Sequence, residues 1–248
     1  MRKIYFLLGI MTISSCNTVS KDLTAQEIID RSITNSNVNL ISNASISFDF
    51  RDRTYNADRY NGVFSLERIT KKGGSITKDI LSNDGFKRYV DDKPVQVPDS
   101  MAIKYSESIN SVHYFAALPY GLNDKAVKKK LLQEITIKEK AYYKIEISFE
   151  QEGGGVDYED VFVYWIEKEN FTIDYIAYKF HVNGGGVRFR EVTKEFRNKG
   201  IRFVNYNNYK PKNETIHVSG LDVEFQNNNL VLLSEINLES IKVIFLNK

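Results

Sequence analysis

The chain contains a single cysteine, Cys16, among its 248 residues. An intrachain disulfide is therefore excluded, and the fold must be stabilised by burial of apolar side chains. Only three histidines are present, His113, His181 and His217, and no two have the i, i+4 spacing of a helical zinc pair. No Gly-x-Ser-x-Gly nucleophile motif occurs either. We therefore predict neither a metal site nor a cofactor, and no catalytic residue is marked by a motif.

The chain also lacks an excess of charge of either sign. It has 34 basic and 32 acidic residues, and removal of Arg2 and Lys3 with a cleaved leader leaves 32 of each. Such a balance argues against a nucleic-acid partner, which requires a basic face. The only basic run, Lys128 to Lys130, is interpreted as the solvated side of a short helix over residues 124–132.

The N-terminus has the pattern of an export signal. Arg2 and Lys3 precede an apolar run, Ile4 to Ile13, that is far shorter than the roughly 20 residues of a membrane-spanning helix. The small residues before Cys16 resemble the lipobox of bacterial lipoproteins, which implies that residues 1–16 hold the signal and that Cys16 is lipidated. An ordinary signal peptide is the alternative. Residues 17–23 then form a tether, residues 24–248 a single domain, and the acyl chains attach it to a membrane.

The hydrophobic pattern predicts an α+β fold built on a large, curved antiparallel sheet with a few helices that cover its concave face. Thr24 and Glu27 form a capping-box pattern at the start of a first helix. Short strands follow, with turn signals at Asn61-Gly62, Gly73-Gly74 and Asp84-Gly85. A second helix begins near Ser100 and ends before Pro119. Five strands of a meander come next: Tyr142–Gln151, Asp157–Glu167, Phe171–Val182, Val187–Arg197 and Ile201–Tyr209. A turn of helix at Leu221 to Phe225 and two strands (LVLLSEI and IKVIFL) close the chain.

Two glycine triplets, Gly153–Gly155 and Gly184–Gly186, precede similar segments of the meander, VDYEDV and VRFREV. A phosphate-binding glycine loop leads into a helix, whereas both segments here have the composition of strands. We therefore interpret the triplets as hairpin turns on the same end of the sheet. If both glycine loops close in the same way, Glu159 lies opposite Lys179 and Lys179 lies opposite Glu191. Further rows would join Asp157, His181 and Phe189, and Tyr158, Phe180 and Arg190.

Two interpretations of these charged residues stay open. In the first, the charges set the register and the glycines permit positive φ angles and close approach of neighbouring loops. In the second, five side chains form a polar rim around a binding mouth. The candidates for that rim are Asp157, Glu159, His181, Arg188 and Arg190.

Three segments carry a resemblance to a known family: YFAALPYGLNDKAV, YYKIEISFEQEGGGVDYEDVFVYWI, and GGGVRFREV with GIRFVNYNNYKP. The chain resembles an uncharacterised family of Bacteroidetes outer-membrane lipoproteins over most of its length. The order of its predicted elements is also similar to that of the Lol-type lipoprotein-sorting carriers. This second resemblance implies an open half-barrel whose concave apolar face holds acyl chains. The two resemblances together imply an outer-membrane lipoprotein of the cell envelope, on either the periplasmic or the surface side.

The aromatic content, 15 Tyr, 15 Phe and one Trp, suits an apolar ligand cavity within such a sheet. The expected register places the candidate ligand-binding residues on one face: Phe149, Val161, Val163, Trp165 and Tyr175. The leading hypothesis is a monomeric, lipid-anchored protein that binds an acyl chain or a similar hydrophobic or amphipathic ligand. The alternatives are an envelope enzyme with Asp157, Glu159 and His181 as acid–base groups, and a scaffold protein without a small ligand.

Overall fold

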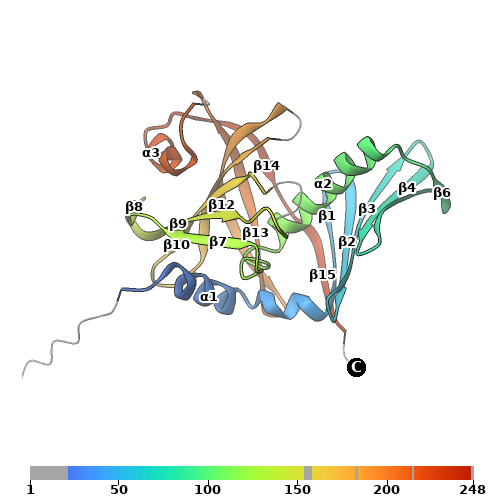
Figure 1. Cartoon of the computed structure of the whole chain (residues 1–248), viewed down its shortest axis with the longest axis horizontal. Coiled ribbons are helices and arrows are strands. Elements are labelled where there is room, and N and C mark those ends of the chain that lie inside the picture. The colour runs from blue at the N-terminus through green and yellow to red at the C-terminus, as the bar shows by residue number, and fades with distance from the viewer. Residues whose placement is uncertain (1–21, 154–157, 182–183, 214, 247–248) are drawn as a thin grey trace, which may run out of the picture.

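Two antiparallel sheets form the framework of the protein (Figure 1). The computed structural model describes residues 22–153, 158–181, 184–213 and 215–246. Within them, a seven-stranded sheet has the order β15-β1-β2-β3-β4-β5-β6, and an eight-stranded sheet has the order β14-β13-β12-β11-β10-β9-β7, with β8 paired to β9. The predicted α+β fold with open, curved antiparallel strands is confirmed. The structure divides the strands between two sheets that splay apart.

The first sheet is built from the early strands together with the last strand of the chain, and the second from the strands of the later meander. The elements are α1 (Ala25–Ser36), η1 (Val38–Asn43), β1 (Ala44–Phe50), β2 (Arg53–Tyr60), β3 (Val63–Lys72), β4 (Ser75–Ser82), β5 (Gly85–Val90), β6 (Lys93–Val95), α2 (Asp99–Ala116), β7 (Val127–Leu131), β8 (Ile135–Ile137), β9 (Lys140–Phe149), β10 (Val161–Glu167), β11 (Ile173–Phe180), β12 (Gly186–Asn198), β13 (Ile201–Pro211), η3 (Val218–Gly220), α3 (Leu221–Gln226), β14 (Leu230–Ile236) and β15 (Glu239–Phe245).

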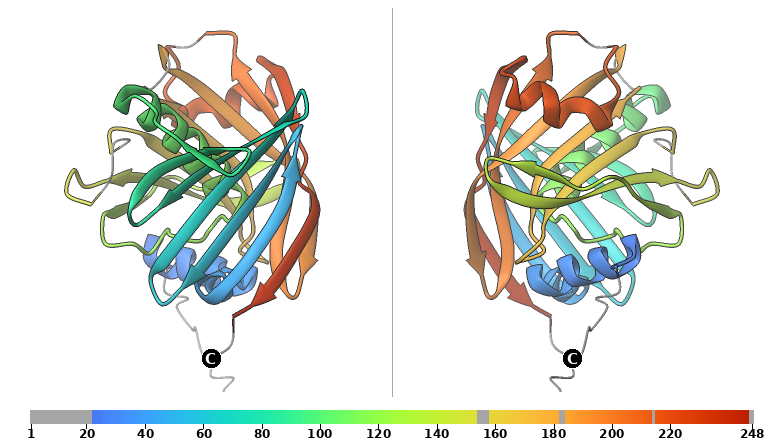
Figure 2. Two further views of the ribbon diagram at one scale, coloured as in Figure 1. Left: turned by 90° about the vertical axis from the view of Figure 1, so that its right-hand side faces the viewer. Right: turned by 90° about the vertical axis from the view of Figure 1, so that its left-hand side faces the viewer.

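The helices occupy three different places around the sheets (Figures 1 and 2). Helix α1 starts with the predicted capping box, since the Thr24 side chain accepts from the backbone N–H of Glu27 and the Glu27 carboxylate accepts from that of Thr24. It continues into η1 along one end of the molecule, whereas α2 runs between the two sheets and α3 lies on the outer side of the eight-stranded sheet. Among the described residues, no helix is both long and apolar enough to cross a membrane.

One large apolar core joins the two sheets. It includes Ile28 of α1, Ile46 of β1, Phe115 of α2 and Tyr164 of β10. A second core lies on the opposite face of the eight-stranded sheet, where η3 and α3 cover it. The central strands of the eight-stranded sheet are therefore buried on both faces, which explains why the segment VFVYWI of β10 is apolar at every position.

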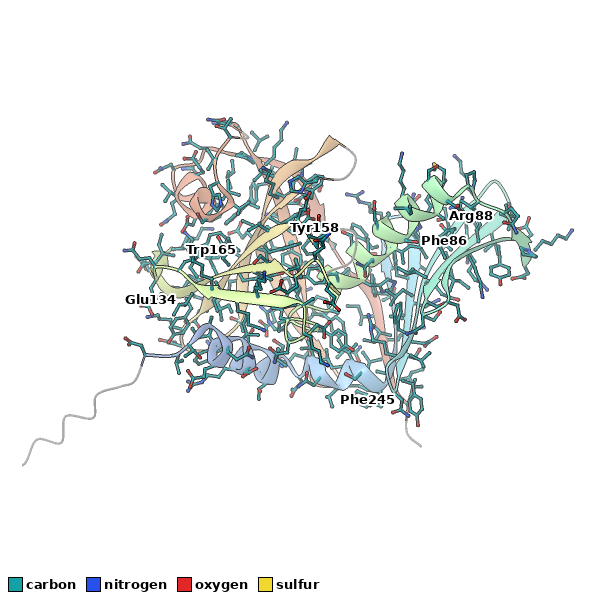
Figure 3. All side chains as sticks on the ribbon, viewed as in Figure 1. Phe86, Arg88, Glu134, Tyr158, Trp165 and Phe245 are labelled. Atoms are coloured by element: carbon teal, nitrogen blue, oxygen red, sulfur yellow. The ribbon has the colours of Figure 1, made fainter. Side chains whose placement is uncertain are left out.

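Helix α2 is attached to the seven-stranded sheet by a buried cluster of charges. Asp79 accepts from Arg68 Nη2 at 2.7 Å and from Arg88 Nε at 2.5 Å. The ring centroid of Tyr105 in α2 lies 3.9 Å from the Cζ of Arg88, and Phe86 stacks on the same tyrosine ring. Phe86 and Arg88 are labelled in Figure 3. The two arginines hold the pKa of Asp79 below its usual value in spite of its burial.

The predicted helix over residues 124–132 is wrong. Val127–Leu131 forms β7, which pairs with β9 as the outermost strand of the eight-stranded sheet. The tertiary pairing overrides the helical preference of this short segment. The lysines of the run lie on an edge strand, where charged side chains discourage pairing with a further chain.

The five-stranded meander β9 to β13 is confirmed, but the predicted register within it is wrong. Lys179 pairs with Val161 and with Val187, not with Glu159 and Glu191. Glu191 lies opposite Tyr175 and forms an ion pair with Lys138 at 2.6 Å. The predicted charge row is therefore absent.

The other two predicted rows also differ from the structure. Arg190 lies opposite Ile176, so it does not share a row with Phe180. Phe189 lies opposite Ala177, whereas His181 follows the end of β11. Asp157, the remaining member of that row, lies outside the described residues.

A bulge in β11 and the lengths of the turns cause these differences. Trp165 pairs with Tyr175 and Ile166 with Ile173, so that Asp174 is an extra residue in β11. Thr193 is a similar extra residue in β12. Relative to the predicted pairing, the observed register of β10 with β11, and of β11 with β12, differs by an even number of residues along most of each ladder. Each side chain therefore keeps its predicted face there. Between β9 and β10 the slip is by one residue, because Phe162 pairs with Ile147, and Phe149 therefore lies on the opposite face from Val163.

Candidate functional site

A pocket opens at the seam between the two sheets, where α2 crosses the concave face. Its volume is about 170 Å³. Most of its lining is apolar, from the end of β1, the last turns of α2, and strands β13 and β14, whereas Arg190 and Asn208 contribute polar groups. The lining residues are Phe50, Arg51, Ser111, Val112, Phe115, Ala116, Arg190, Val204, Tyr206, Asn208, Ser234, Ile236 and Leu238.

Aromatic rings surround the Arg190 guanidinium. Its Cζ lies 3.5 Å from the ring centroid of Phe115 on α2, 5.2 Å from that of Tyr178 and 5.8 Å from that of Tyr206. Arg190 Nη2 donates to the Tyr178 hydroxyl at 2.8 Å. The side chain is thus held by ring faces and one neutral oxygen, and only 8% of the residue is exposed.

Two polar atoms of pocket residues, Arg190 Nε and Asn208 Oδ1, are buried and have no hydrogen-bond partner among the described residues. The two residues face each other as a cross-strand pair of β12 and β13. The Asn208 amide nitrogen donates to Ser234 Oγ at 3.3 Å. Because buried polar groups are almost always paired, unpaired atoms on two neighbouring residues that line one pocket call for an explanation.

The wall behind these residues is neutral. The hydroxyls of Tyr114 on α2 and Tyr164 on β10 share a hydrogen bond of 2.6 Å. Burial raises the pKa of both groups above the usual value, and burial also raises the pKa of Tyr206. These tyrosines therefore supply no negative charge to balance Arg190 at neutral pH.

Four of the five predicted ligand-binding residues lie on the other side of the eight-stranded sheet. Val163, Trp165 and Tyr175 belong to the core beneath η3 and α3, with Val161 packed against it. Trp165 Nε1 donates to Asp222 at 3.1 Å, and Lys144 forms an ion pair with the same carboxylate at 2.8 Å.

The fifth predicted residue, Phe149, packs edge-on against Phe162 in the large core. None of these five residues lines the seam pocket.

The structure also separates the members of the predicted polar rim. Glu159 is exposed in the turn before β10, and His181 Nδ1 lies 3.2 Å from Asp160 Oδ1. Arg188 lies over the Phe180 ring, 5.1 Å from its centroid. Of the rim candidates that the structure describes, only Arg190 lines the seam pocket.

The second glycine loop has the predicted backbone role. Gly184, Gly185 and Gly186 have φ angles of 90°, 71° and 150°. A Cβ on Gly185 would lie 3.0 Å from the Phe180 carbonyl oxygen. The glycines are therefore required by the tight turn. In the first triplet, Gly153 has a φ of 82°, and the other two lie outside the described residues.

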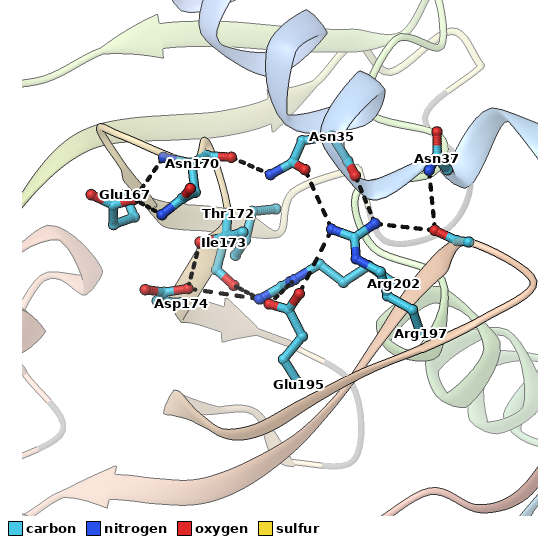
Figure 4. A network of polar contacts seen from close by, with 11 residues as sticks. Asn35, Asn37, Glu167, Asn170, Thr172, Ile173, Asp174, Glu195, Arg197 and Arg202 are labelled. Atoms are coloured by element: carbon cyan, nitrogen blue, oxygen red, sulfur yellow. Dashed lines mark hydrogen bonds and ion pairs between the residues drawn. The ribbon is translucent and has the colours of Figure 1, made fainter.

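A second hollow, of about 330 Å³, lies near the two bulges of β11 and β12. Its buried charges are already paired: Arg202 contacts Glu195 at 2.7 Å and Asp174 at 3.7 Å, and donates to the carbonyl of Ile173 (Figure 4). The same network continues to α1, where Asn35 donates to the Asn170 carbonyl. These contacts attach α1 to the hairpins of the sheet, so we interpret this hollow as structural.

Among the described residues, no group of three or more His, Cys, Asp or Glu side chains converges to hold a metal ion. The residues of the seam pocket that sequence reasoning missed come mainly from α2, β13 and β14. The alternation of Val204, Tyr206 and Asn208 was visible as a shared face of one strand. Nothing in the sequence indicated that this face meets the end of α2.

Fold and pocket together define an open, two-sheet α+β protein with a small, mostly apolar pocket at the seam. The chain belongs to a family of unknown function, DUF6503, whose model matches residues 2–238. No curated protein sequence matches it.

Several solved structures show a distant likeness. A LolA superfamily protein from Nitrosomonas europaea has 11% identity and a TM-score of 0.46, over 92% of this chain and 95% of that one. A DUF1329 family protein from Desulfovibrio piger has 10% identity and a TM-score of 0.42, over 88% and 92%. The Mycobacterium tuberculosis lipoprotein LppX has 8% identity and a TM-score of 0.28, over 65% and 91%. All three TM-scores lie below 0.5, so no ligand follows from them.

Proposed function

We propose that the protein is a lipid-anchored lipoprotein of the cell envelope that binds a hydrophobic or amphipathic ligand in the seam pocket. The proposed anchor is Cys16, which lies outside the described residues and is supported by the export signal and the lipobox-like residues before it. The proposed outer-membrane location is supported by the resemblance of the segments YFAALPYGLNDKAV and GGGVRFREV to Bacteroidetes outer-membrane lipoproteins.

The observation that carries the proposal is the apolar lining of a pocket between the two sheets. Phe115, Val204 and Ile236 come from three different elements and converge on it. Burial of apolar ligand surface there contributes about 0.8 kcal/mol for each methylene. The elements that frame the pocket are connected through the large core, so its lining is held in place by packing on both sheets.

The volume limits how much of a ligand is enclosed. At about 170 Å³ the pocket is close in size to an engineered cavity of roughly 150 Å³ that binds benzene. It therefore holds one ring or a short stretch of an alkyl chain. The rest of a longer chain would extend out of the pocket into solvent.

The test is a titration of the purified, leader-free protein with straight-chain fatty acids of increasing length, followed by calorimetry. Each added methylene should tighten binding about fourfold until the pocket is filled, and then the affinity should level off. Native mass spectrometry of protein extracted from its own membrane should show a bound amphipathic molecule of the same class.

A substitution that fills the pocket provides the matched control. Ala116→Phe places a ring in the pocket from α2, whereas Ala102→Phe makes the same change on α2 outside the pocket. We expect loss of binding for the first variant and unchanged binding for the second, with both folded by circular dichroism. Affinity that is independent of chain length and unaffected by Ala116→Phe would refute the proposal.

A further inference from the structure

Three arginines are buried in the described parts of the chain, and one of them differs from the other two in how its charge is balanced. Arg68 forms an ion pair with Asp79 at 2.7 Å, and Arg202 forms one with Glu195 at 2.7 Å. Arg190 is equally buried but has no carboxylate within ion-pair distance among the residues that the structure describes. A buried charge without a counter-ion is costly, so an unbalanced arginine in a ligand pocket requires an explanation.

The surroundings of Arg190 cover the planar face of its guanidinium but leave one N–H of its edge without an acceptor among the described residues. Phe115 covers the guanidinium plane at 3.5 Å, and the Tyr178 hydroxyl accepts from Nη2. The Nε hydrogen lies in the guanidinium plane and has no acceptor. Arg190 thus brings a permanent cation to the lining of a mostly apolar pocket, where an oxygen acceptor with negative charge would form a short, strong hydrogen bond with its guanidinium.

The neighbouring strand adds a complementary acceptor. Asn208 Oδ1 is buried and unpartnered in the same pocket, and Asn208 lies directly opposite Arg190 in the β12–β13 ladder. A head group that fits both atoms must accept from Arg190 and donate to Asn208. A carboxylate with a hydroxyl on an adjacent carbon has this pattern, and its alkyl chain suits the apolar remainder of the lining.

We propose that the seam pocket is selective for an amphipathic ligand whose head group is a hydroxy-carboxylate, with Arg190 binding the carboxylate and Asn208 binding the hydroxyl. This inference rests on the proposed function, because it assigns the head group of the ligand that the pocket would hold. One ligand accounts both for the two unpartnered atoms and for the lack of a carboxylate beside Arg190 in the described parts of the chain.

The test compares three ligands of one chain length on the same protein: 2-hydroxyoctanoate, octanoate and methyl octanoate. The wild-type protein should bind octanoate about tenfold or more tightly than the ester, since a hydrogen bond to a charged group is among the strong ones. The hydroxyl should add a further factor of about two to ten. Equal affinity for all three ligands would overturn the head-group assignment while leaving the proposed function in place. If none of the three ligands bound, the result would count against the proposed function itself.

Variants assign each preference to its residue. Arg190→Gln should bind the acid and the ester equally, and Asn208→Ala should lose only the preference for the hydroxyl. Arg190→Lys keeps a cation and should retain part of the preference for the acid, which separates loss of charge from loss of packing against Phe115. A thermal melt of each variant verifies that it is folded.

Arg188→Gln is the matched control. Arg188 lies on the same strand and on the same face, and it also contacts an aromatic ring, that of Phe180, but it does not line the pocket. Its substitution should leave the order of the three ligands unchanged. If Arg188→Gln abolished the preference for the acid while Arg190→Gln preserved it, the assignment to Arg190 would be wrong.

Discussion

The stability of the protein should depend on pH through one buried histidine of α2. His113 is 2% exposed, and its Nε2 lies 3.2 Å from the carbonyl oxygen of Glu67 in β3. The rings of Phe48 and Tyr55 contact it edge-on at 5.6 Å. Burial is the main cause that lowers its pKa to about 4; the backbone hydrogen bond to Glu67 opposes this shift and the nearby Arg59 cation adds to it.

The sign and size of the effect follow from the two protonation states. His113 is neutral in the folded protein down to about pH 4, whereas in the unfolded chain it gains a proton below about 6.5. Between these values the unfolded state binds more protons, so the stability that this group contributes is present above pH 6.5 and is lost as the pH falls toward 4. From pH 7 to pH 4.5 the expected loss is about 2.5 kcal/mol, at 1.36 kcal/mol for each unit of pKa difference.

The assay is urea unfolding of the wild-type protein and of His113→Gln at a series of pH values from 7 to 4.5. Gln keeps a donor for the Glu67 carbonyl but does not titrate, so the variant should lose about 2.5 kcal/mol less than the wild type over this range. Other titrating groups change the stability of both proteins by the same amount. Among them, the pKa of Asp79 is lowered, and burial raises the pKa of Asp174. Parallel pH profiles for the two proteins would refute the reasoning, whatever the constant offset between them.

Further substitutions test the contacts that hold the elements in place, each by chemical denaturation. Asp222→Asn leaves the ammonium of Lys144 buried without its counter-ion and should destabilise the protein by about 3–5 kcal/mol. Asp79→Asn removes the shared partner of two arginines under α2 and should cost a similar amount. Gly185→Ala forces a side chain into a positive-φ turn beside a carbonyl oxygen and should cost at least about 1 kcal/mol, whereas no change would show that the loop rearranges freely. Thr24→Ala removes the cap of α1 and should cost about 1 kcal/mol.

Local features of this fold were predictable because the residues that decide them are neighbours in the chain. The capping box at Thr24 selects the start of α1 from four consecutive residues. The turns at Asn61-Gly62 and Asp84-Gly85 connect adjacent strands by residues that tolerate positive φ. Strand alternation in VRFREV placed Phe189 and Arg190 on opposite faces of the sheet, and the structure keeps that assignment.

Features that join distant segments were not predictable. The bulges at Asp174 and Thr193 shift the register, and a one-residue slip between β9 and β10 moves Phe149 to the other face. The same limitation applied to β7, where pairing with β9 overrides the local preference for a helix.

The sequence by itself determined the class of fold, the order of most of its elements and the alternation of side chains along each strand of the meander, because each follows from spacing along the chain. Only the tertiary structure decided that the strands form two sheets and that α2 lies in the seam between them. That packing brings Phe115 onto the guanidinium of Arg190, and no described residue accepts from the Nε–H of this buried cation. Burial and the balance of charge depend on contacts between segments far apart in sequence, so the candidate site emerged from the fold.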